Sequence, residues 1–68
     1  SSGAPDFLVC WRSLFFGIEC KAGKNTTTAL QDLNIDAIRK AGGKAIVINE
    51  DNADQLESWM RAHEIISN

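Results

Sequence analysis

The chain is short, mildly acidic and of ordinary globular composition. It has 68 residues, of which 44% are hydrophobic and 24% charged, and its formal net charge is −2 at pH 7. This composition excludes a fibrous repeat or a disordered chain, and no apolar run approaches the roughly 20 residues needed to cross a bilayer. A negative net charge is also not typical of a nucleic-acid-binding domain. We expect a single domain over residues 1–68.

The first residues and the cysteines bear on location. Ser1-Ser2-Gly3 lacks the basic and apolar regions of a signal peptide, so we expect a cytoplasmic protein. Cys10 and Cys20 are too few and too widely spaced for a zinc knuckle or a C-x-x-C redox pair. In the cytoplasm both should be free thiols, and a disulfide between them is the less favoured alternative.

The first third of the chain predicts a hairpin. Ala4-Pro5 favours an extended backbone, because proline lacks an amide proton and disfavours helix in the residue before it. Two apolar and aromatic runs follow, Phe7 to Trp11 and Phe15 to Lys21, and Arg12-Ser13-Leu14 between them is the expected reversal.

The rest of the chain predicts a helix, a strand and a second helix. A polar loop ends in threonines that can cap a helix starting near Thr28 or Ala29, and Gly42-Gly43 ends that helix. Lys44 to Asn49 is a β-branched strand, which we expect to be central in the sheet. The last helix should start near Ala53. The expected apolar stripe of the first helix is Leu30, Leu33, Ala37, Ile38 and Ala41, and that of the second is Leu56, Trp59, Met60, His63 and Ile66.

The element order β-β-α-β-α predicts a small mixed α/β sheet. A helix between the second and third strands makes a crossover connection, so these two strands should run parallel, while the first two form the antiparallel hairpin.

Glu19 and Lys21 are the unexpected residues of the second strand, because a buried charge is costly unless it is paired or binds a metal. Side chains two positions apart in a strand point to the same face. Asp6 joins that face if the reversal is a two-residue turn at Arg12-Ser13 or Ser13-Leu14, whereas a three-residue turn centred on Ser13 would place Asp6 on the other face.

Two neighbouring carboxylates favour a bound divalent cation. Asp6 and Glu19 would repel each other without one. Oxygen ligands of this kind suit Mg²⁺ or Mn²⁺, and the backbone carbonyl of Cys20 can supply one more ligand. Lys21 would then lie beside a metal-bound water, where its ammonium can orient the water and offset negative charge on a phosphate.

Pro5-Asp6, twelve intervening residues and Glu19-Cys20-Lys21 together resemble the PD-(D/E)xK nuclease superfamily, and the similarity to its VRR-NUC branch extends over residues 3 to about 49. The segments that carry it are Gly3-Ala4-Pro5-Asp6, Ile18 to Lys24, Gln31, and Ala41-Gly42-Gly43 before a β-branched strand.

The resemblance implies a restriction-endonuclease-like core and a Mg²⁺- or Mn²⁺-dependent DNA nuclease with Asp6, Glu19 and Lys21 at the three motif positions. It assigns Gln31 a supporting role from the helix after the catalytic strand. Members of the family with a minimal domain are often phage-encoded, and a homodimer that cuts four-way (Holliday) junctions is one known arrangement among them. A phage-encoded protein would act in the host cytoplasm.

The family usually has a helix before the first motif, often with another acidic residue, and the sequence offers no room for it before Asp6. A fragment or a sparser metal site is therefore expected. Among the remaining basic residues we expect a DNA contact only from Lys24, because its loop lies beside Lys21. The alternatives are a non-catalytic DNA-binding or assembly module that keeps the fold, and a structural domain in which Glu19 and Lys21 face water from an edge strand.

Overall fold

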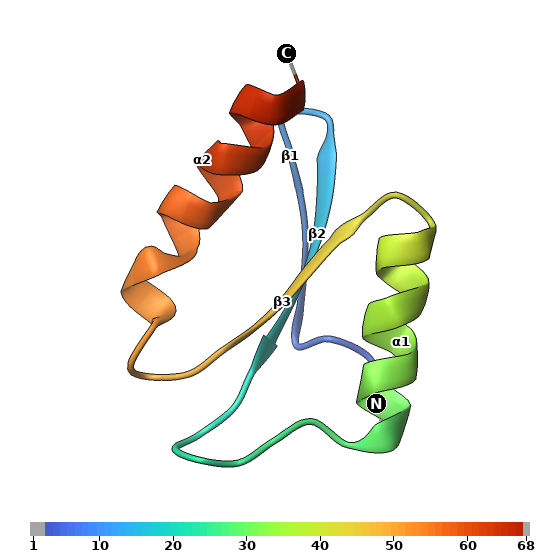
Figure 1. Ribbon diagram of the computed structural model, residues 1–68, viewed down its shortest axis with the longest axis vertical. Coiled ribbons are helices and arrows are strands. Elements are labelled where there is room, and N and C mark those ends of the chain that lie inside the picture. The colour runs from blue at the N-terminus through green and yellow to red at the C-terminus, as the bar shows by residue number, and fades with distance from the viewer. Residues whose placement is uncertain (1–2, 68) are drawn as a thin grey trace.

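The computed structural model describes residues 3–67, and of these the side chains of residues 3–64. It confirms the small mixed α/β fold with the element order β-β-α-β-α. The elements are β1 (Phe7–Trp11), β2 (Leu14–Cys20), α1 (Ala29–Lys40), β3 (Lys44–Ile48), a 3₁₀ turn at Ala53–Gln55, and α2 (Leu56–Ser67). Figure 1 shows α1 and α2 on opposite sides of the sheet. Among residues 3–67, no helix has the length and apolar character needed to span a membrane.

The β1–β2 hairpin closes through the two-residue turn Arg12-Ser13, because Trp11 and Leu14 are cross-strand partners. Both turn residues lie in the left-handed region, with φ of 51° and 67°, as the turns that match the twist of a hairpin require. The Arg12 guanidinium forms an ion pair of 2.9 Å with Glu64 of α2, which anchors the turn to that helix. Leu14 therefore begins β2 instead of belonging to the reversal.

β2 is the central strand of the sheet, whose order is β1-β2-β3. β2 pairs antiparallel with β1 and parallel with β3, as the crossover predicts. The prediction that β3 is central is wrong: the hairpin takes one edge of β2, the crossover returns β3 to the other, and no strand of residues 3–67 pairs with the outer edge of β3.

The ends of α1 follow from local chemistry. Thr28 and Gln31 form a capping box, in which the Thr28 hydroxyl accepts from the Gln31 N–H and the Gln31 side chain accepts from the Thr28 N–H. Gly42 adopts φ of +95° just after the helix, a conformation that glycine reaches without strain.

The expected apolar stripe of α1 is largely wrong. Leu33 is 67% exposed and Leu30 is 47% exposed, whereas Ile35, at 7%, is the buried residue of the helix. Gln31, Ile35 and Ile38 share one helical face by their spacing of three and four residues, and Gln31 bonds to Glu19 of the sheet. The helix is therefore turned so that this face, with a polar residue at its start, covers β2 and β3.

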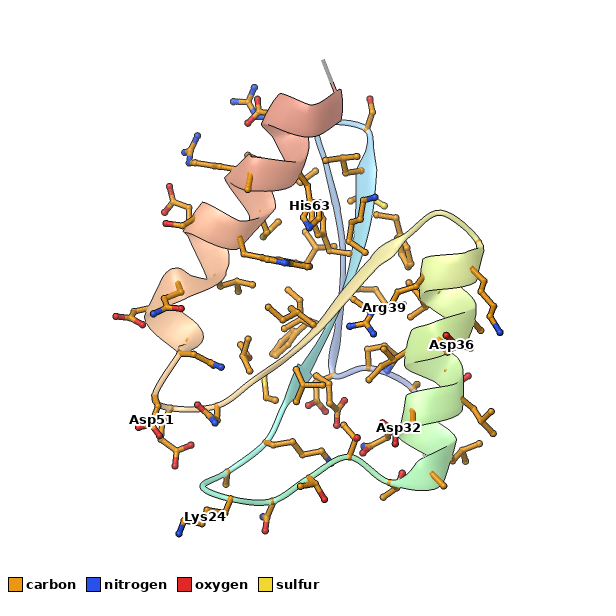
Figure 2. All side chains as sticks on the ribbon, in the orientation of Figure 1. Lys24, Asp32, Asp36, Arg39, Asp51 and His63 are labelled. Atoms are coloured by element: carbon orange, nitrogen blue, oxygen red, sulfur yellow. The ribbon has the colours of Figure 1, made fainter. Side chains whose placement is uncertain are left out.

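α2 covers the other face of the sheet with an aromatic cluster. Phe16 of β2 is completely buried, and the centroid of its ring lies 5.4 Å from that of Trp59 and 6.2 Å from that of His63. Figure 2 shows His63 pointing from α2 toward the sheet. The expected inner residues Leu56, Trp59, Met60 and His63 are all half-buried, while the side chain of Ile66 lies outside the described part of the chain.

Candidate active site

The candidate site lies on the α1 side of β2, at the C-terminal end of the strand. Residues alternate along β2, so Phe16 and Ile18 pack toward α2 while Glu19 points toward α1. Glu19 is only 3% exposed and is the one buried polar or charged residue among residues 3–64. The interpretation of Glu19 as a water-facing charge on an edge strand is therefore wrong, because β2 is central and the side chain is buried.

One oxygen of the Glu19 carboxylate has two donors. Oε2 accepts a hydrogen bond of 2.7 Å from Gln31 Nε2 and forms an ion pair of 3.3 Å with Lys21 Nζ. The Lys21 side chain is 18% exposed, so its ammonium lies between the buried carboxylate and solvent. Charge-assisted bonds of this kind offset much of the cost of burying the carboxylate.

The other Glu19 oxygen, Oε1, is buried and has no hydrogen-bond partner among the described residues. Buried carboxylate oxygens are rarely left in this state, and each exception calls for an explanation such as a bound ion or water. Oε1 is therefore a buried acceptor that no described residue satisfies.

Asp6 lies next to Glu19 across the hairpin. The pairing Phe7↔Ile18, continued by one residue, places Asp6 opposite Glu19, as the two-residue turn requires. Asp6 Oδ2 accepts a 2.8 Å hydrogen bond from the Cys20 N–H. Because the N–H and C=O of one strand residue face the same neighbour, the Cys20 carbonyl is directed to the same edge as Asp6.

These atoms match a small hard cation better than a soft one. Among the described residues no cluster of three or more His, Cys, Asp or Glu side chains forms a metal cage. Asp6, Glu19 and the Cys20 carbonyl instead offer only oxygen ligands, and Mg²⁺ keeps several waters and needs few protein ligands. The residues present therefore fit a partly hydrated Mg²⁺ or Mn²⁺.

The thiol of Cys20 reports on the local charge. Cys10 and Cys20 are both free and exposed. The pKa of Cys20 is raised, first by partial loss of solvent and then by the negative charges of Asp6 and Glu19. The same two carboxylates that disfavour a thiolate favour a bound cation.

The remaining basic residues do not form one patch with the site. Lys24 is exposed in the loop between β2 and α1, and Figure 2 shows its side chain pointing away from the body of the protein. By contrast, Arg39 Nη2 donates to the Ala45 carbonyl at 2.9 Å, and Lys40 forms an ion pair of 2.8 Å with Asp36. Lys24 remains the basic side chain predicted to reach DNA from beside Lys21.

Glu50 is a residue of this region that the sequence did not single out. Both of its carboxylate oxygens accept from the N–H of Gly23, at 2.8 and 3.0 Å. Only the topology could have indicated this contact: Gly23 and Glu50 follow neighbouring parallel strands, so the loops that contain them leave the sheet side by side.

Comparisons of the chain with protein-family models, with curated proteins and with solved structures find no match. The family resemblance of the motifs therefore stays a prediction.

Proposed function

We propose that this protein is a metal-dependent deoxyribonuclease that hydrolyses phosphodiester bonds. The observation that carries the proposal is the buried Glu19 carboxylate, with Oε1 unpaired, Asp6 opposite and Lys21 on Oε2. A purely structural domain gains nothing from a buried carboxylate with one unpaired oxygen, since such groups lower stability. Sites that perform chemistry often carry such costs.

Asp6, Glu19 Oε1 and the Cys20 carbonyl would hold the Mg²⁺ or Mn²⁺ ion. When bound, such an ion polarises a phosphate oxygen and makes a water molecule more acidic. The protein's share is to fix the ligands: the Cys20 N–H bond orients Asp6, and the Gln31 bond orients Glu19.

Lys21 would act on the phosphate or on the attacking water. Its ammonium is held by Glu19 Oε2 and remains partly exposed, so it can donate to an incoming phosphate oxygen or orient a water for attack. Developing negative charge on the phosphate is then met by a fixed positive charge in a site partly shielded from water. Gln31 acts through Glu19 and is a positioning residue.

A structure-selective endonuclease acting on four-way junctions or related DNA is the activity that we propose within this class, with Lys24 contacting a phosphate beside the site. A homodimer would present two such sites to two strands. A cytoplasmic location agrees with a DNA substrate. Support for these finer points comes from the motif resemblance and the exposed position of Lys24.

The test is incubation of the protein with labelled four-way junction, duplex and single-stranded DNA, in Mg²⁺, Mn²⁺ or EDTA. We expect cleavage that requires the metal and that Lys21→Ala reduces by at least about a hundredfold, because general acid–base and charge-stabilising groups typically contribute that much.

Lys40→Ala is the matched control, since it removes the same charge from an exposed ion pair on α1. It should leave the cleavage rate within about twofold, as expected for a surface pair. Full activity of Lys21→Ala would contradict the proposal. DNA binding without either cleavage or a Mn²⁺ site would favour the non-catalytic DNA-binding module.

A further inference from the structure

We propose that Glu50 is a positioning residue that holds the loop between β2 and α1, and with it Lys24, in the geometry that binds a DNA phosphate beside Lys21. The proposal rests on the proposed function. It starts from the contact between the Glu50 carboxylate and the Gly23 N–H, which both carboxylate oxygens make.

The contact extends the sheet by one step. The last backbone bond of the β2–β3 ladder runs from the Lys21 N–H to the Ile48 carbonyl, at 2.8 Å. In a parallel ladder the next bond donated by β2 would join the N–H of Gly23, two residues on, to the backbone carbonyl of Glu50, also two residues on. The same two residues are joined here, but the side chain of Glu50 replaces its backbone carbonyl as the acceptor.

The replacement is needed because the chain turns away directly after β3. Asn49 Oδ1 accepts from the N–H groups of Asp51 and Asn52, at 2.9 and 3.2 Å, and Asn52 Oδ1 accepts from the Asn49 N–H at 2.8 Å. These bonds fold residues 49–52 into a tight turn. The side chain of Glu50 is long enough to reach back across it to β2.

The consequence falls on Lys24, because Gly23 is its neighbour in the chain. Gly23 has φ of +56°, and the loop closes with a bond from the Asn25 N–H to the Ala22 carbonyl. Figure 2 shows Lys24 and Asp51 at the same end of the molecule, where β2 and β3 finish. Fixing Gly23 therefore limits the positions open to the Lys24 ammonium.

Position and charge make opposite predictions for Glu50, which gives a sharp test. Its carboxylate is negative and lies beside a loop proposed to bind phosphate, so by charge alone its removal should strengthen DNA binding. If it positions Lys24, loss of the hydrogen bond should weaken binding instead.

The experiment measures the Kd of the full chain for labelled four-way junction DNA in EDTA, where no cleavage occurs. Glu50→Ala should raise Kd about threefold to tenfold, the range expected from losing one ordered contact. Glu50→Gln keeps an acceptor for the Gly23 N–H and should bind at least as tightly as the native protein. Asp51→Ala removes the same charge from the next residue. Asp51 takes part in the turn through its backbone N–H, which the substitution keeps, so this variant should not weaken DNA binding.

Two further measurements separate positioning from a general loss of structure. In a Lys24→Ala background, Glu50→Ala should not raise Kd further, because the side chain that it positions is already gone and only the loss of a negative charge remains. Amide hydrogen exchange at Gly23 should accelerate in Glu50→Ala and stay slow in Glu50→Gln.

Equal or tighter DNA binding by Glu50→Ala, or the same loss in both backgrounds, would overturn the positioning role. Unchanged exchange at Gly23 would overturn the contact itself. If the native protein does not bind DNA, the proposed function fails and this role fails with it, whereas DNA binding with an indifferent Glu50 leaves the nuclease proposal intact.

Discussion

The two faces of β2 bury side chains of opposite character. Toward α2 the strand presents Phe16 and Ile18, which are 0% and 4% exposed and lie in an apolar, partly aromatic core. Toward α1 the same strand presents Glu19, equally buried but bonded to Lys21 and Gln31. One face buries apolar area, which stabilises the fold, and the other buries charge, which costs stability.

This difference shows how one short strand can serve both the core and the candidate site. Because successive side chains of a strand point to opposite faces, neighbouring residues of β2 can belong to the core on one side and to the candidate site on the other. Because β2 is central and both its faces are covered, the apolar side keeps the strand fixed while the charged side keeps an unpaired carboxylate oxygen away from bulk solvent.

Substitutions on the two opposite faces of β2 should therefore differ strongly in their effect on the free energy of unfolding. Phe16→Ala should lower the free energy of unfolding by about 3–5 kcal/mol, the usual cost of removing a buried aromatic ring. Glu19→Gln should change it by less than about 1 kcal/mol, because Lys21 can reach water and the introduced amide oxygen still accepts from Gln31. Urea denaturation followed by tryptophan fluorescence measures both free energies of unfolding, and a larger loss for Glu19→Gln than for Phe16→Ala would contradict the assignment of stability to the apolar face.

Gln31 belongs both to the capping box of α1 and to the candidate site, and the two roles can be tested separately. Gln31→Met removes the donor to Glu19 and should weaken Mn²⁺ binding about 10–100-fold, as is typical when a bond that orients a metal ligand is lost. Thr28→Ala is the matched control, since it removes the capping-box hydroxyl but leaves the Glu19 bond. It should cost about 1 kcal/mol of stability and leave metal affinity nearly unchanged. Equal losses of Mn²⁺ affinity in the two variants would mean that Gln31 acts only as part of the capping box.

Much of the site's geometry could be predicted from the chain, because short-range rules decide it. The spacing of Glu19 and Lys21 fixes a shared face, and a two-residue turn at Arg12-Ser13 fixes Asp6 opposite Glu19. The ends of α1 were also predictable, since Thr28 and Gly42 act through local hydrogen bonds and backbone conformation.

The rotation of α1 and the place of β3 were not predictable, because each depends on distant partners. In the sequence, Leu33 fits a helical apolar stripe as well as Ile35 does. The face of α1 that meets the sheet is the one that carries Ile35 and the Gln31–Glu19 bond. The β-branched residues of β3 do not reveal whether the strand is central or at an edge: Ile48 is buried, whereas Val47 is 36% exposed. Glu50 gave no pattern at all, since its role appears only when the β2 and β3 ends are brought together.

The most direct test of the proposed nuclease site is a Mn²⁺ titration by isothermal calorimetry, comparing the native chain with Glu19→Gln. Asp36→Asn serves as control, because it neutralises an exposed carboxylate paired with Lys40 on the outer part of α1. We expect a saturable site in the native protein and in Asp36→Asn that is absent in folded Glu19→Gln. Equal Mn²⁺ binding by Glu19→Gln, or none by the native protein, would contradict the assignment of Glu19 Oε1 as a metal ligand.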